Sequence, residues 1–179
     1  MRSLALATIA VATALLAADT ADGAPSFVIR GDTRIGTFAV QTDGSLSGAI
    51  RAFGAPRLRR SGEACTATWL AYGLTMNFYN LGGANPCTPR HGRFSKAITY
   101  GTRWRTDKGL RIGMPSSGIR THYPRATFHR GLRSYWPSGW RLVTRPERFG
   151  GAGTYPGLLA VTANRTVVSF QVRFPAGGD

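Results

Sequence analysis

Acidic residues are scarce in this sequence. The 179-residue chain has eight aspartates and glutamates against 23 lysines and arginines, which gives a formal net charge of +15. Glycoside hydrolysis needs a pair of carboxyl groups, and a hard divalent cation needs several oxygen ligands. Both are hard to assemble from so few side chains, so we expect no cofactor and no metal site. Beyond residue 23 the acidic residues are Asp32, Asp43, Glu63, Asp107, Glu147 and Asp179.

The short motifs of common enzyme classes are also missing. The chain contains no G-x-S-x-G elbow, no H-E-x-x-H helix and no G-x-x-x-x-G-K loop. A hydrolase triad could be drawn from Ser116 or Ser117, His122 or His129, and Asp107, but no spacing among them is specific. We therefore predict a protein that is not an enzyme, with a small hydrolase as the weakest alternative.

No apolar run is long enough to span a bilayer. Residues 4–18 are uncharged and follow Arg2, but they fall short of the roughly 20 apolar residues that a membrane helix needs. Small residues around Ala21 and Gly23 fit a cleavage site. We predict a signal peptide at residues 1–23 and a secreted or cell-envelope protein with no transmembrane segment after the signal. An uncleaved N-terminal anchor is the alternative.

Cysteine occurs only at Cys65 and Cys87. In an exported chain, an even pair usually forms a disulfide. Such a bond would close a loop of about 22 residues and contribute roughly 3 kcal/mol in the chain-entropy model. A metal site is the weaker interpretation, because two cysteines alone cannot complete a tetrahedral zinc site. A nucleophilic thiol is the other alternative.

Glycine and proline are frequent, which favours many turns and short strands. Residues 74–81 alternate in polarity, and residues 65–70 are their hairpin partner across Gly73. Residues 168–174 alternate in the same way and pair with residues 158–162 across Asn164. We therefore predict two antiparallel hairpins.

Two short helices are predicted between these strands. Residues 45–53 follow an N-cap at Asp43 or Ser45, and the stretch from Gly54 ends the helix. Residues 115–123 begin with a proline suited to a first helical turn and end before Pro124.

Parts of the chain repeat. Arg34-Ile35-Gly36 is matched by Arg111-Ile112-Gly113, and each match is followed by a helix and then by strands. We predict an α+β fold of two similar halves, each with a short helix packed on an antiparallel sheet. The first half would cover residues 24–90 with the disulfide, and the second would cover residues 91–179. A chance likeness of two α+β halves is the alternative.

The repeated pattern resembles a known architecture. Ile35-Gly36 with the stretch 53–56 (FGAP), and Ile112-Gly113 with Tyr123-Pro124, resemble the β-lactamase inhibitory protein and BamE-like superfamily. The stretches GLRIG at 109–113 and YPGLLA at 155–160 resemble uncharacterised secreted actinobacterial proteins. The resemblance implies an exported tandem fold over most of residues 27–174 and assigns no activity. No residue matches the inhibitory loops of that family, so no binding residue is carried over.

Basic residues are dense between residues 90 and 148. This stretch holds 14 arginines and lysines against only Asp107 and Glu147, with aromatic residues interleaved. Guanidinium groups beside rings are typical of polyanion grooves, although a solvated sheet face over an aromatic core has the same composition. Our leading hypothesis is an exported binding module for an extracellular protein. The alternative is binding of a cell-wall or nucleic-acid polyanion through two basic loops, whose residues are Arg57, Arg59, Arg60, Arg125, Arg130 and Arg133.

Overall fold

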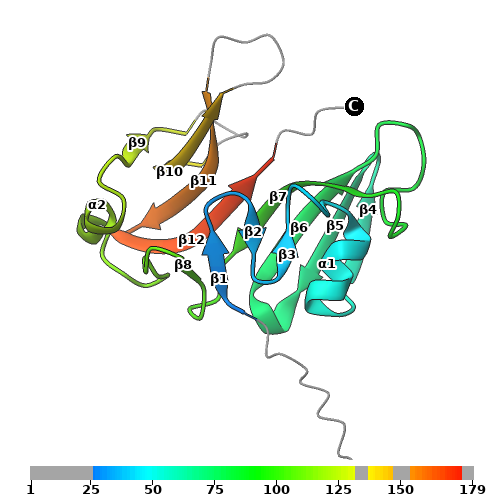
Figure 1. Ribbon diagram of the computed structural model, residues 1–179, viewed down its shortest axis with the longest axis horizontal. Helices are drawn as coiled ribbons and strands as arrows, with labels where there is room; N and C mark the ends of the chain where they lie inside the picture. Colours follow the sequence, from blue (N-terminus) through cyan, green and yellow to red (C-terminus); the bar gives the residue numbers. More distant parts are fainter. Residues whose placement is uncertain (1–25, 132–136, 147–153, 175–179) are drawn as a thin grey trace, which may run out of the picture.

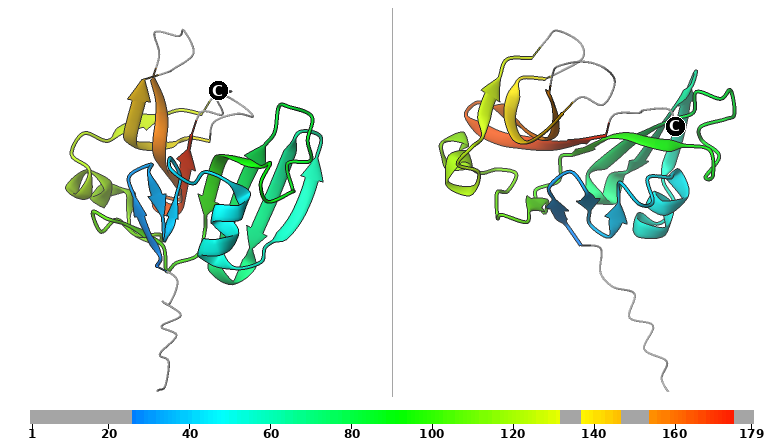
Figure 2. Two further views of the ribbon diagram at one scale, coloured as in Figure 1. Left: turned by 45° about the vertical axis from the view of Figure 1, so that its right-hand side comes forward. Right: turned by 45° about the horizontal axis from the view of Figure 1, so that its top comes forward.

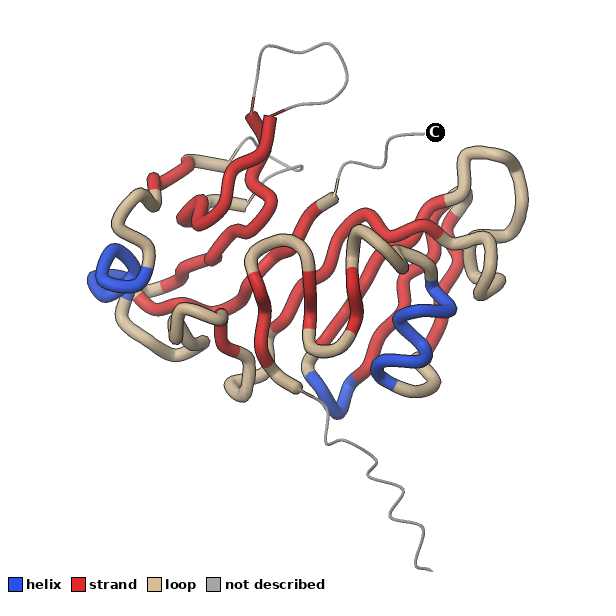
Figure 3. The backbone as a smooth tube through the Cα atoms, in the orientation of Figure 1, coloured by secondary structure: helices blue, strands red, loops and turns tan. Residues whose placement is uncertain are grey.

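The computed structural model describes residues 26–131, 137–146 and 154–174. The predicted signal peptide lies outside the described residues. Strands dominate the described part, and the helices are few and short (Figure 3).

The largest element is an eight-stranded antiparallel sheet (Figure 1). Its strand order is β4-β5-β6-β7-β12-β11-β10-β9. Two meanders, β4 to β7 and β9 to β12, are joined where β7 pairs with β12. The sheet therefore continues without a break across the predicted boundary at residue 90. Its strands are β4 (Arg57–Ser61), β5 (Ala64–Trp69), β6 (Leu74–Tyr79), β7 (Arg93–Thr99), β9 (Thr127–His129), β10 (Gly139–Pro146), β11 (Thr154–Ala163) and β12 (Thr166–Arg173).

A smaller four-stranded sheet has the order β3-β2-β1-β8, in which β1 and β8 run parallel. This sheet and helix α1 lie on the same face of the large sheet, as both views of Figure 2 show. The strands of the small sheet are β1 (Val28–Arg30), β2 (Arg34–Ile35), β3 (Phe38–Ala39) and β8 (Arg105–Thr106). The helical segments are α1 (Leu46–Phe53), α2 (Ile119–His122) and the 3₁₀ turns η1 (Leu70–Tyr72) and η2 (Ser116–Gly118).

The predicted fold class is wrong. The chain is mostly β, and it does not form two halves that each pack a helix on a sheet of their own. The predicted helix at 115–123 is a 3₁₀ turn followed by four α-helical residues. Ser116, Ser117 and Gly118 have poor helix propensity, and Pro124 blocks any extension. The helix at 45–53 does form, because Ser45 caps it and its apolar face is buried.

Both predicted hairpins form. Gly73 adopts a left-handed conformation (φ 56°) between η1 and β6. Asn164 and Arg165 have φ values of 48° and 59°, and this backbone geometry matches a type I′ turn between β11 and β12. The predicted disulfide between Cys65 and Cys87 is also present.

Among the described residues, one hydrophobic core lies between the two sheets and α1. Trp104 is its largest fully buried side chain, and its Nε1 donates to the Tyr72 carbonyl at 2.7 Å. Trp69 is buried beside Phe53 and donates to the Gly54 carbonyl at 2.9 Å. Both indole N–H groups are therefore satisfied inside the core.

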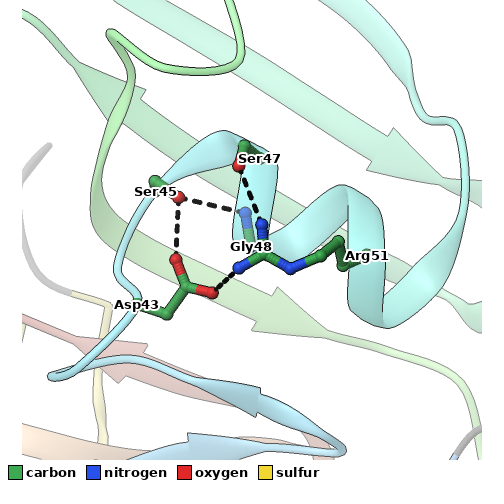
Figure 4. A network of polar contacts seen from close by, with 5 residues as sticks. All are labelled: Asp43, Ser45, Ser47, Gly48 and Arg51. Atoms are coloured by element: carbon green, nitrogen blue, oxygen red, sulfur yellow. Dashed lines mark hydrogen bonds and ion pairs between the residues drawn. The ribbon is translucent and has the colours of Figure 1, made fainter.

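A polar network holds the start of α1 (Figure 4). The Ser45 hydroxyl accepts from the Gly48 N–H at 3.0 Å and donates to Asp43 Oδ1 at 2.9 Å. Arg51 donates to the other oxygen of Asp43 and, at 3.1 Å, to the Ser47 hydroxyl. Ser45 is thus both the helix cap and the link between the helix and the preceding carboxylate.

We expect Ser45→Ala to lower the free energy of unfolding by about 1 kcal/mol, because the Gly48 amide loses its cap. Urea denaturation followed by tryptophan fluorescence measures the loss. Ser47→Ala is the matched control, since the Ser47 hydroxyl accepts from the exposed Arg51 side chain and caps no backbone amide. Equal losses for the two variants would contradict the capping role of Ser45.

A candidate anion-binding face

The large sheet has a second face that points away from the core. Along β5 the side chains of Cys65, Ala67 and Trp69 are buried, whereas Thr66 and Thr68 between them are half-buried. The same alternation continues in β6. The residues of this second face are therefore placed by strand register alone.

Basic residues align across this face. Arg59 pairs with Thr66, Thr66 with Asn77, Asn77 with Lys96, and Lys96 with Arg173. This row crosses five neighbouring strands, a span of about 19 Å at the usual strand spacing. Two further arginines lie in the adjacent rows. We call the set the cationic face; its members are Arg57, Arg59, Arg93, Lys96 and Arg173.

Carboxylates are missing from the strands of this face. None of β4, β5, β6, β7 and β12 contains an aspartate or glutamate. The positions between the basic residues are mostly hydroxyl or amide side chains, among them Thr66, Thr68, Thr75 and Asn77. The cationic face is therefore a row of positive charges among hydrogen-bonding groups.

Two basic residues of this face, Lys96 and Arg173, repel each other. Lys96 and Arg173 lie directly opposite each other on β7 and β12, where like charges are unfavourable. Burial lowers the pKa of Lys96, and the charge of Arg173 lowers it further. Burial also lowers the pKa of Arg173, against an opposite effect from Tyr79. Burial therefore disfavours the charged forms of both side chains.

The predicted anion-binding residues do not converge. Arg57 and Arg59 are exposed on the cationic face, whereas Arg60 points to the opposite face of β4 and donates to the Gly62 carbonyl. Arg125 and Arg130 are exposed on either side of β9. Strands β4 and β9 are the two opposite edges of the sheet, so the two groups are far apart. Arg133 lies outside the described residues.

Three members of the cationic face were missed by the sequence analysis. Arg173 lies on the polar side of the alternation that predicted β12, so the sequence was sufficient to predict which face of the strand it occupies. Arg93 and Lys96 lie on β7, for which no strand was predicted. Their alignment with Arg173 depends on the pairing of β7 with β12, which no local pattern indicates.

The candidate hydrolase residues have other partners. His122 Nδ1 lies 2.6 Å from the Lys108 carbonyl oxygen, and Asp107 accepts from the Tyr123 hydroxyl at 3.4 Å. Burial, ahead of the Asp107 charge, raises the pKa of Tyr123 to about 12. His129 lies on β9 with its Nδ1 2.9 Å from Arg141. None of these contacts joins a histidine to Ser116 or Ser117.

Neither a metal cluster nor a membrane helix is found in the described ranges. No group of three or more His, Cys, Asp or Glu side chains is gathered in a metal-binding arrangement within residues 26–131, 137–146 and 154–174. In the same ranges no helix has the length and apolarity needed to cross a bilayer.

Comparison with known proteins gives only distant structural neighbours. No family model and no curated protein matches the sequence. The chain is similar to the crystal structure of an extracellular protein containing an SCP domain from Bacillus anthracis, with 9% identity and a TM-score of 0.43. That match covers 74% of this chain and 44% of the other, so the chain spans less than half of that protein's length. It is also similar to the uncharacterised protein YfeY from Escherichia coli, with 14% identity, a TM-score of 0.33, and coverage of 82% and 98%.

Proposed function

We propose that this protein is an exported, non-enzymatic binding module that holds a linear polyanion against the cationic face. The observation that carries the proposal is the row from Arg59 to Arg173, set by backbone pairing across five strands free of carboxylates. The disulfide supports an oxidising compartment, in agreement with the predicted signal peptide.

A polyanion fits this face better than a folded protein partner. Protein interfaces are rich in aromatic and apolar groups at their centre. Here the central strands β6 and β7 carry Thr75, Asn77 and Lys96 on this face, with Ile98 and Tyr79 as their apolar or aromatic members. A flexible chain of phosphate or carboxylate groups can place successive charges along such a row, because each guanidinium pairs with an oxyanion.

We expect the double variant Arg59→Gln/Lys96→Gln to weaken binding to a single-stranded DNA oligonucleotide and to heparin. Binding of a polyanion releases counterions, so removing two phosphate contacts should reduce the slope of log affinity against log salt by about 1.4. Fluorescence anisotropy of a labelled oligonucleotide over a series of salt concentrations measures this slope.

The matched control is Arg125→Gln/Arg130→Gln, which removes the same charge at the opposite edge of the sheet. The control should keep the salt slope of the unaltered protein. If the control loses the slope and the Arg59/Lys96 variant does not, the basic segments around β9 bind the polymer and the proposed face is wrong. Absence of salt-sensitive binding in the unaltered protein would also overturn the proposal.

A further inference from the structure

A second cluster of arginines surrounds a hollow on the small sheet. The hollow has a volume of about 440 Å³, within the range of small-molecule sites. It is formed around β1 and β8, which belong to the sheet packed on the core side of the large sheet. It is therefore separate from the cationic face. Its lining residues are Ser26, Phe27, Val28, Thr102, Arg103, Arg105 and Arg111.

Arg103 is held in place before any ligand arrives. Its guanidinium carbon lies 4.1 Å from the centre of the Phe27 ring, and one terminal nitrogen donates to the Ala71 carbonyl at 2.6 Å. The Phe27 ring meets the rings of Trp104 and Tyr72 edge to face, at 5.2 Å and 5.9 Å. Because Trp104 is fully buried, the core itself fixes the platform on which Arg103 rests. Little conformational entropy is then lost when Arg103 binds an anion.

Arg105 and Arg111 are brought together by the backbone. The Arg105 N–H donates to the Phe27 carbonyl at 3.0 Å, and Arg105 lies opposite Val28 in the parallel pair of β1 and β8. A further bridge pairs Arg105 with Arg111. Both side chains are exposed, and like charges placed directly opposite repel each other.

No described carboxylate neutralises these three arginines. Within the described ranges the two ion pairs involve Arg51 and Arg145. Asp107, two residues beyond Arg105, does not line the hollow and accepts from Tyr123 instead. The hollow thus collects three positive charges and the hydroxyls of Ser26 and Thr102.

We propose that this hollow binds a small phosphate-bearing molecule. A guanidinium group can donate two parallel hydrogen bonds to two oxygens of a phosphate. Three guanidinium groups together suit a doubly charged phosphate better than a singly charged carboxylate. The hydroxyls of Ser26 and Thr102 can donate to remaining phosphate oxygens. The volume leaves room for an organic group attached to the phosphate.

Isothermal titration of the full chain with inorganic phosphate, pyrophosphate and glycerol phosphate tests the proposal. Arg105→Gln and Arg111→Gln should each raise the dissociation constant roughly tenfold, because each removes a charge-assisted bidentate contact. Arg34→Gln is the matched control, since Arg34 is an exposed arginine on β2 of the same sheet and does not line the hollow. It should change the dissociation constant by less than about twofold. Acetate, a monoanion, should bind more weakly than phosphate in every case.

Two further variants make the test decisive. Arg105→Lys keeps the charge and loses the fork, so it should still weaken phosphate binding; it also serves if Arg105→Gln does not fold. Arg59→Gln/Lys96→Gln should leave phosphate binding unchanged, because it alters only the cationic face. The inference is overturned if no saturable phosphate or pyrophosphate binding is seen. It is also overturned if Arg34→Gln weakens binding as much as Arg105→Gln, or if the loss follows the Arg59/Lys96 variant.

Discussion

Replacing Arg145 with glutamine is expected to lower the free energy of unfolding by about 3 kcal/mol at neutral pH, because it leaves a buried carboxylate without its partner. Asp32 is 1% exposed and accepts two hydrogen bonds from Arg145, at 2.8 Å and 2.7 Å. Arg145 is 44% exposed, so we place the effect at the lower end of the range for buried pairs. Urea denaturation followed by fluorescence measures the loss.

Arg51→Gln is the control for this prediction. Arg51 also pairs with an aspartate, Asp43, but through one nitrogen only, and its side chain is 65% exposed, so its loss should cost less than about 1 kcal/mol. The double variant Asp32→Asn/Arg145→Gln should recover part of the lost stability, because it removes the uncompensated charge. Equal losses for Arg51→Gln and Arg145→Gln would contradict the argument from burial.

The position of Asp32 depends on a glycine of the large sheet. A Cβ at Gly157 would lie 2.5 Å from Asp32 Oδ2, so only glycine leaves room for the carboxylate. Arg30-Gly31-Asp32 has the sequence of an adhesive tripeptide, and the alternative from the sequence alone is a turn between strands. The turn is present, but the carboxylate is buried against β11 and paired with Arg145 on β10. That arrangement argues against adhesion through this tripeptide.

Features that depend on neighbours in the sequence could be predicted. The cap at Ser45 and the turns at Gly73 and Asn164 are set by side-chain and backbone preferences within a few residues. The pairing of β7 with β12 could not be predicted in this way, because it joins segments some 70 residues apart. The strands of the small sheet are two or three residues long, too short to show a period.

The candidate site was only partly predictable for the same reason. Strand β4 has the sequence RLRRS, in which apolar and polar residues do not alternate, so no pattern indicated a strand. Its basic residues were assigned to a loop, and that assignment is wrong. Arginines on an edge strand discourage pairing with a second chain. Arg57 and Arg59 thus protect the edge while extending the row of charges on the cationic face.

Replacing both cysteines, Cys65→Ala/Cys87→Ala, is expected to lower the free energy of unfolding by about 3 kcal/mol. The bond closes a stretch of 22 residues, and its loss restores conformational freedom mainly to the unfolded chain. Cys65 is fully buried on β5, and alanine avoids adding an unsatisfied hydroxyl there. Urea denaturation of the unaltered protein with and without reductant measures the same difference, and the double variant should not respond to reductant. A loss below about 1 kcal/mol would contradict the prediction.

The disulfide should also affect α1, because the segment it ties down holds the start of that helix. The amides of Leu46 and Ser47 donate to the carbonyls of Gly92 and Pro89, each at 3.0 Å. Both carbonyls lie just beyond Cys87, so freeing this segment removes the fixed partners of the first turn of the helix. In hydrogen exchange, the Leu46 and Ser47 amides should lose protection on reduction before the Met76 amide in the middle of the sheet does. Simultaneous loss at all three amides would instead mean that the bond acts only on global stability.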